Sequence, residues 1–385
     1  MKNAIAVLLS VFLWSTAHGQ GQVWIVDFAG GGDFVTLDAA IAAAADGDTL
    51  VVRPGLYNVW STIDDRSLNI HGDGALVQVE GTLQIQSLTA GKQVVIRGLI
   101  WRWPAQLIVF SSAGVVWVDE CQIEADLYGG SGAYGAIHAD QSSQVIVNNC
   151  FVAGSIQYGY YAAPPTDGLH AVNSTVYAMG TNFWGGAGVD TSYPDLAGAD
   201  GAYLSAATLF INSSTCHGGA GRNEMGGNGV TGRNAADLHL QGSTLYRGPG
   251  TPPGVALDLD AGSTVNDYPG SAYGYRADSP VRYGQTMDLI YRGGAGDLVW
   301  LFAGLTPEAT WMPALQSTLA LELSQAWWTL RGVLPANGFR AESVTVPSFA
   351  GMASVSVYTQ PMFLASDGQL TLGPASAALL LDPAY

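Results

Sequence analysis

The sequence predicts an all-β protein in which a solenoid of stacked strands is followed by a smaller β-domain. The first observation is a repeated pattern of apolar–x–apolar, two turn-like residues and a small residue. It occurs in six segments, which end at Leu99, Cys121, Cys150, Thr181, Ser214 and Ser243. The second observation is the spacing of these segments, since subtracting successive end positions gives intervals of 22 to 33 residues, which are typical of solenoid repeats. The third observation is a change near residue 286, where apolar strands at closer spacing begin.

The chain begins with features of a secretory signal peptide over residues 1–19. Lys2 supplies a positive charge, residues 4–13 form a short apolar run, and residues 17–19 form a small-x-small cleavage site. Other apolar runs are too short or too interrupted to span a bilayer. We therefore expect a secreted or cell-surface protein without membrane insertion.

Net charge narrows the classes of partner. The formal net charge is −17, and Lys2 and Lys92 are the only lysines in the chain. Such a surface repels nucleic acid and anionic membranes. It also repels an anionic polysaccharide unless a cation bridges the two. We expect polysaccharide or other extracellular matrix material as the partner, and composition does not determine the oligomeric state.

The first elements of the mature chain form a cap and a first coil. Residues 23–28 and 49–53 have strand-like patterns, and residues 36–45 are expected to form a short helix with Thr36 as its N-cap. A solenoid needs its open apolar end covered. The predicted helix can cover that end.

The runs Gly32–Ile41 and Asp46–Tyr57 resemble the N-terminal cap of right-handed parallel β-helix proteins of the pectate-lyase-like superfamily, which includes pectin methylesterases. The match is close over this cap, and the coil pattern extends it to about residue 270. The resemblance implies a right-handed parallel β-helix with three strands in each coil. It does not specify an activity, because the superfamily holds lyases, hydrolases, esterases and adhesins.

Applied to one coil, the resemblance places strands at residues 136–140, 144–147 and 150–152. Gly-rich loops follow the third strands, over residues 154–167, 185–201 and 218–229, and we expect them to have no packed core. The predicted domains are a signal peptide at 1–19, a parallel β-helix at 20–285 and a C-terminal β-sandwich at 286–385.

The three cysteines cannot all pair with one another. Cys121 and Cys150 occupy the same position in adjacent repeats, so a disulfide between them is sterically feasible. The alternative is that they are small buried residues that fill a ladder in the core. The sequence leaves both alternatives open.

The candidate active site is the outer face of the first strands, which is where enzymes of the resembled superfamily react. Alternation assigns two rows of outward side chains, namely His138, His170 and Tyr203 in one row and Asp140, Ser205 and Arg233 in the other. These residues could supply a general base and a cation beside the long loops. The alternative is a solvated polar face without activity.

Calcium is the one cofactor that the sequence suggests. Acidic residues gather in or beside the loops, at Asp167, Asp190, Asp195 and Asp200, and calcium binds oxygen ligands of this kind. Lyases of the resembled superfamily use such a calcium ion with an arginine or lysine base, a role that Arg222 or Arg233 could take here. No D-x-D-x-D-G loop occurs, and the catalytic signatures of polygalacturonases and pectin methylesterases are absent.

A second candidate binding surface is a row of large apolar residues on the outer face of the second strands. We call it the outer stripe, and it includes Trp117, Tyr177 and Phe210. Such a stripe is costly when exposed. The C-terminal domain, a partner or second copy, or sugar rings could cover it. We expect the C-terminal domain to do so through Trp327 and Trp328.

Two classes of function are compatible with this sequence. The first is a non-catalytic secreted or cell-surface protein that binds glycan or matrix material, and the missing catalytic signatures favour it. The alternative is a calcium-assisted polysaccharide lyase or a related carbohydrate-active enzyme, with its site over the first-strand face.

Overall fold

The computed structural model describes residues 21–74, 76–125, 135–156, 164–188, 197–222, 224–268, 270–349 and 351–385, apart from the side chains at 103 and 104. The signal peptide predicted at residues 1–19 lies outside the described residues. Within them, no helix is both long and apolar enough to cross a membrane.

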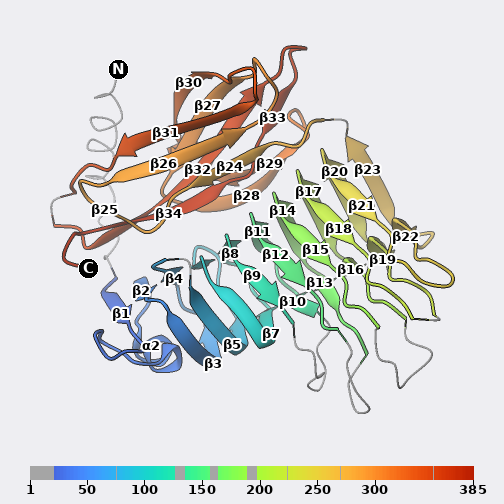
Figure 1. The fold of residues 1–385 in the computed structure, drawn as a ribbon, viewed down its shortest axis with the longest axis horizontal. Helices are drawn as coiled ribbons and strands as arrows, with labels where there is room; N and C mark the ends of the chain where they lie inside the picture. Colours follow the sequence, from blue (N-terminus) through green and yellow to red (C-terminus); the bar gives the residue numbers. More distant parts are fainter. Residues whose placement is uncertain are drawn as a thin grey trace.

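The N-terminal part of the chain is a parallel β-helix, as the sequence predicts (Figure 1). Its second strands form a ten-stranded parallel sheet, in the order β1 (Val23–Val26), β2 (Asp48–Val52), β4 (Leu68–Gly72), β6 (Gln93–Arg97), β8 (Val115–Asp119), β11 (Gln144–Asn148), β14 (Thr175–Met179), β17 (Thr208–Asn212), β20 (Asp237–Gln241) and β23 (Thr264–Tyr268).

The first and third strands belong to one continuous parallel sheet. The first strands are β10 (Gly135–Asp140), β13 (Asp167–Val172), β16 (Ala202–Ser205), β19 (Val230–Arg233) and β22 (Leu257–Leu259). The third strands are β9 (Gln122–Glu124), β12 (Phe151–Ala153), β15 (Asn182–Trp184), β18 (Thr215–His217) and β21 (Thr244–Tyr246). The two sets are joined by the long strands β3 (Gly55–Asp64), β5 (Val77–Gln86) and β7 (Ile100–Phe110), because β7 pairs with both β9 and β10.

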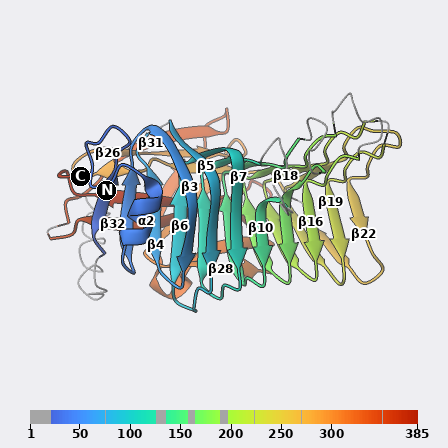
Figure 2. The same ribbon diagram turned by 90° about the horizontal axis from the view of Figure 1, so that it is seen from below.

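A short helix, α2 (Leu37–Ala43), covers the N-terminal end of the solenoid, while β22 lies at the other end (Figure 2). The hydroxyl of Thr36 accepts a hydrogen bond from the Ala39 N–H at 3.3 Å, which confirms the predicted N-cap. Leu37, Ala40 and Ile41 are buried in the solenoid core.

A ladder of side-chain hydrogen bonds runs through the turn between the second and third strands. The backbone N–H of Cys121 donates to Sγ of Cys150, and the N–H of Cys150 donates to the hydroxyl of Thr181. Ser214 and Ser243 continue the ladder in the next two coils. The residues that end these repeats therefore stack in one column. Cys121, Cys150 and Cys216 are free buried thiols, so no disulfide joins Cys121 to Cys150.

The bases of the Gly-rich loops stack on one another through backbone hydrogen bonds, and we call this region the glycine layer. The chain of bonds runs from N–H to carbonyl through Gly254, Gly248, Gly227, Gly219, Ala199, Gly186 and Thr166. A Cβ built on Gly219 would lie 1.9 Å from the carbonyl oxygen of Gly186, so no side chain fits at this position. The described residues at the base of these loops are thus held together by backbone hydrogen bonds.

The C-terminal domain is built from two sheets and a hairpin. A three-stranded antiparallel sheet contains β24 (Gly274–Ala277), β26 (Thr286–Arg292) and β31 (Phe339–Thr345). A six-stranded sheet contains β25 (Val281–Arg282), β34 (Ser376–Leu381), β32 (Ser354–Leu364), β27 (Leu298–Gly304), β30 (Trp327–Val333) and β33 (Leu370–Leu372). The hairpin is formed by β28 (Pro307–Met312) and β29 (Ser317–Leu321), and it precedes the short 3-10 helix η1 (Leu323–Gln325).

The two C-terminal sheets pack face to face around buried aromatic residues, which include Tyr275, Tyr291 and Phe363. Because β24 pairs with β26, this domain begins near Gly274, before the boundary at 286 predicted from the sequence. In Figure 1 the domain lies along the flank of the solenoid, above the sheet of second strands.

Candidate functional site

The outer face of the first strands carries the row that the sequence predicts. His138 pairs in register with His170 on the next coil, and His170 with Tyr203. The two imidazole rings lie 5.4 Å apart between centroids, and the ring of Tyr203 stacks on that of His170 at 4.7 Å. All three side chains are half-buried. We call this set the ring row.

Asp167 fixes the orientation of His170. The Nδ1 atom of His170 lies 2.9 Å from a carboxylate oxygen of Asp167, which is the first residue of the same strand. A carboxylate at Nδ1 favours a hydrogen there and leaves Nε2 as an acceptor. Burial, together with the neighbouring imidazole of His170, lowers the pKa of His138. The arrangement suits His170 to accept a proton or to bind a hydroxyl group.

A polar column lies beside the ring row, where the loops return to the first strands. The N–H of Asp200 donates to Asp167 at 3.0 Å, and the N–H of Asn228 donates to Asp200 at 2.7 Å. Burial raises the pKa of Asp167. Burial and the charge of Asp167 raise the pKa of Asp200 to about 6. In this column, the carboxyl groups of Asp167 and Asp200 each accept a hydrogen bond from a backbone N–H of the following coil.

Arg233 lies in the second predicted row, where it pairs in register with Ser205. Its guanidinium forms an ion pair with Asp258 on the following coil, and this hydrogen bond raises the pKa of Arg233. A raised pKa opposes the base role expected from the sequence, because a base must lose its proton. Asp140 aligns with Val172, which separates it from Ser205 in that row.

The calcium expectation finds little support in the geometry. The carboxyl oxygens of Asp167 already accept hydrogen bonds from His170 and from the N–H of Asp200, and Asp200 accepts one from the N–H of Asn228, so few of their oxygens are left for calcium. Asp190 and Asp195 lie outside the described residues. Elsewhere in the described chain, no three His, Cys, Asp or Glu side chains gather as a metal site.

The outer stripe is buried beneath the C-terminal domain, as expected from the sequence, so the alternative of an open binding surface does not apply to the described structure. Trp117 is fully buried and packs against Tyr358 with ring centroids 5.0 Å apart. Phe210 stacks on Trp311 of the hairpin at 5.0 Å. The covering elements are mainly β28, β29 and β32, together with the chain around Ala375 and Ala377.

The expected covering residues, Trp327 and Trp328, do not contact the stripe. Trp328 is 62% exposed, and Trp327 packs inside the C-terminal domain. Tyr358 and Trp311 cover the stripe instead, together with small residues such as Ala309 and Ala320, which let the two domains approach closely.

Sequence reasoning missed a second aromatic stack, on the outer face of the third strands. His217 stacks on Trp184 at 4.1 Å and on Tyr246 at 4.4 Å. Each of these residues stands three positions after a residue of the hydrogen-bonded ladder, Thr181, Ser214 or Ser243. That fixed offset was the available signal.

No family model matches this chain, and no curated protein matches it. Among solved structures, it is similar to the enzymatically active domain of tailspike protein 2 of bacteriophage CBA120, with 9% identity and a TM-score of 0.29 over 86% of this chain and 66% of that one. It is also similar to the PL6 family alginate lyase AlyGC, with 12% identity and a TM-score of 0.28 over 67% and 40% of the respective chains.

A third similar structure is pectate lyase Pel9A, with 9% identity and a TM-score of 0.30 over 64% of this chain and 79% of that one. The chain spans less than two thirds of the length of the tailspike and alginate lyase chains. The assignment as a parallel β-helix stands on the strand pairing described above.

Proposed function

We propose that this parallel β-helix protein is secreted or displayed at the cell surface and binds a polysaccharide along the outer face of its first strands. The observation that carries the proposal is the ring row of His138, His170 and Tyr203, which repeats one ring on each of three successive coils. Coils repeat at about 4.8 Å. A surface with a repeating unit suits a ligand with a repeating unit.

The chemistry of the row favours a neutral glycan. Imidazole and phenol groups donate and accept hydrogen bonds, which hydroxyl-rich sugars can satisfy. The formal net charge of −17 opposes a polyanion at long range. A uronate polymer would need a bridging cation such as calcium, which the binding test therefore includes as a separate condition.

A second candidate function is polysaccharide cleavage, and one observation favours it. The 2.9 Å contact between Asp167 and His170 orients an imidazole in the way that general bases are oriented. In this mechanism Nε2 of His170 takes a proton from the sugar or from water. Tyr203, stacked on the same ring, would then stabilise or protonate the leaving oxygen.

The experiment is a binding screen of the purified protein against neutral and uronate polysaccharides, with and without calcium. We expect at least one polymer to bind, and His170→Ala to weaken that binding by about tenfold. The matched control is His217→Ala, which removes a histidine from a different face of the solenoid. Binding that both variants retain in full would contradict the proposal.

The same variants separate binding from cleavage. If the protein cleaves a bound polymer, His170→Ala should slow product formation by about 10²–10⁴-fold. Asp167→Asn should slow it while leaving the dissociation constant nearly unchanged, because the imidazole keeps its place but loses its oriented tautomer. Binding without product at any tested pH would leave the binding function and exclude the enzyme.

A further inference from the structure

The outer face that carries the ring row continues toward the N-terminal end of the solenoid. Parallel pairing joins β3, β5, β7, β10, β13 and β16 in that order, and Figure 2 shows β3, β5, β7, β10 and β16 side by side. Ile108 of β7 pairs in register with His138, so the positions that continue the ring row are Ile108, Gln84 on β5 and Thr62 on β3. The same face therefore extends three coils beyond the ring row.

A second row of outer side chains lies beside these positions, two residues earlier on each strand. It consists of Trp60 on β3, Thr82 on β5 and Gln106 on β7, which pair in register. The two rows together present six uncharged side chains, which we call the neutral strip. Its amide and hydroxyl groups donate and accept hydrogen bonds. The strip therefore suits a ligand that is uncharged and rich in hydroxyl groups.

The neutral strip is flat because its strands are continuous. β5 and β7 run from the third-strand part of the coil into the first-strand part, whereas Gly-rich loops separate these parts in the coils that carry the ring row. Two amides of the strip are held in place. Nε2 of Gln84 donates to Gln86 at 2.6 Å, and Nε2 of Gln106 donates to the carbonyl of Gly135 at 3.1 Å. A floor with fixed side chains loses little entropy when a ligand binds.

Trp60 stands at the far end of the neutral strip and is 64% exposed. A Cβ built on Gly81 of β5 would lie 3.2 Å from Cε2 of the Trp60 ring, so the indole lies against the neighbouring strand. The backbone N–H of Trp60 donates to Asp38 of α2 at 3.0 Å, which ties this part of β3 to the cap. The indole is thus held at the sheet surface, where its exposed part is available to a ligand.

We propose that Trp60 is the terminal sugar-binding platform of an extended site, in which one neutral glycan chain lies along the neutral strip and the ring row. This proposal rests on the polysaccharide binding proposed above. Five coil intervals separate β3 from β16, and at about 4.8 Å each they span about 24 Å. A pyranose unit of an extended chain is about as long as one coil, so the site takes about six units. The apolar face of the last unit packs on the indole.

The test is a calorimetric titration of the full-length protein with dextran, pullulan, galactomannan and mixed-linkage glucan, and with three-unit and six-unit fragments of each polymer that binds. Six-unit fragments should bind about tenfold more tightly than three-unit fragments, because only the longer chain reaches from the ring row to Trp60. Trp60→Ala should remove this gain. Trp60→Phe should keep most of it, because a phenyl ring also packs on a sugar.

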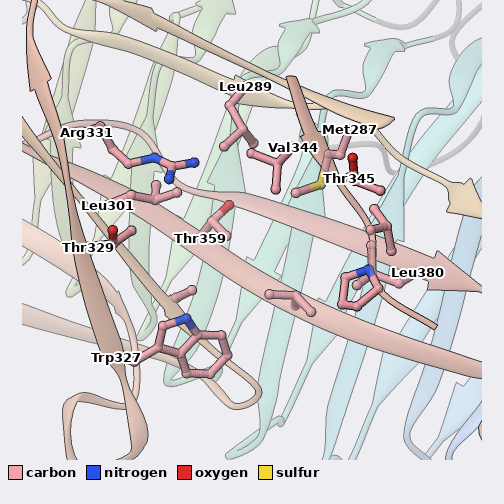
Figure 3. Close-up of a pocket in the computed structure, with 14 residues that line it drawn as sticks. Met287, Leu289, Leu301, Trp327, Thr329, Arg331, Val344, Thr345, Thr359 and Leu380 are labelled. Atoms are coloured by element: carbon pink, nitrogen blue, oxygen red, sulfur yellow. The ribbon is translucent and has the colours of Figure 1, made fainter. Parts of the chain in front are cut away.

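Trp328→Ala is the matched control, since Trp328 is 62% exposed but belongs to the C-terminal domain. The preceding residue, Trp327, lines a cavity between the two sheets of that domain (Figure 3). Trp328 therefore points to the opposite face of β30. The control should bind six-unit fragments as tightly as the original protein does. Equal melting temperatures of the variants and the original protein would show that a loss of binding is not a loss of folding.

The outcomes separate this proposal from the function on which it rests. If His170→Ala weakens binding and Trp60→Ala does not, the extended site is wrong and the ring row remains the binding site. If Trp60→Ala weakens binding and His170→Ala does not, the idea of one chain along both surfaces is overturned. If only a uronate polymer binds, this proposal fails while polysaccharide binding survives. If no polysaccharide binds at all, both proposals fail.

Discussion

The contact between the two domains depends on a buried arginine, which allows a quantitative test. Arg97 lies at the end of β6 with its side chain 2% exposed, and its Nη1 lies 2.6 Å from Asp119. The same nitrogen donates to Ser376 and to the carbonyl of Ala377 in β34. Burial alone would lower the pKa of Arg97, but the charges of Asp119 and Glu120 outweigh it and raise the pKa.

The proposed change is Arg97→Met, which keeps the length of the side chain and removes its charge. Removing one partner of a buried ion pair costs about 3–5 kcal/mol, because the other charge is left without compensation. Asp119 would still accept hydrogen bonds from Asn148 and from the N–H of Ala377. We therefore expect a loss of about 3 kcal/mol in the free energy of unfolding.

Urea unfolding followed by tryptophan fluorescence is a suitable assay, because Trp117 lies in the same interface. Arg282→Met is the matched control, since Arg282 joins Asp73 across the same two domains with side chains 27% and 24% exposed. Partly exposed pairs contribute about 1 kcal/mol or less. Adding Asp119→Asn to Arg97→Met should recover part of the loss. If Arg97→Met changes the unfolding free energy no more than the control does, the reasoning is refuted.

Three further predictions concern the glycine layer, the polar column and the outer stripe. Gly219→Ala should lower the melting temperature sharply, whereas Gly262→Ala, whose Cβ would have 3.7 Å of clearance, should not; equal effects would contradict the layer's role. Burial raises the pKa of Asp200 in the folded protein, so the free energy of unfolding should fall as pH rises from about 4 to 6. Asp200→Asn should flatten that part of the pH profile by about 1–3 kcal/mol. An unchanged profile would contradict the effect assigned to Asp200. Ending the chain at residue 272 should expose the stripe and cause self-association in sedimentation, and a monomer that melts unchanged would contradict this.

The sequence predicted the coil register well because burial with a period of two leaves little freedom. A slip of one residue would turn Ile137 or Leu169 outward and break the column of small residues at the turns. The neighbours of His138, His170 and Tyr203 followed directly from that register. This part of the fold is encoded locally, coil by coil.

Other parts could not be predicted because they depend on contacts between distant segments. The prediction of Trp327 and Trp328 as covering residues chose the wrong aromatic side chains, because Tyr358 and Trp311 pack on the stripe, beside small residues such as Ala320. Nothing near Gly274 signals that β24 pairs with β26. The contact between Asp167 and His170 was also missed, because Asp167 was assigned to a loop rather than to the start of β13.

The glycine layer has a consequence for how the chain can change over evolution. Each loop has an outgoing limb, which leaves a third strand, and a returning limb, which leads to the next first strand. In successive loops these limbs alternate along one line of hydrogen bonds, as at Gly186, Ala199 and Gly219. Deleting one loop would leave the limbs on both sides without partners, so the loops are interdependent near the solenoid. New sequence can enter only farther out, beyond the alternating limbs. Near the ring row, the sequence at the base of the loops is thus constrained by these hydrogen bonds, whereas the sequence farther out in the loops can vary.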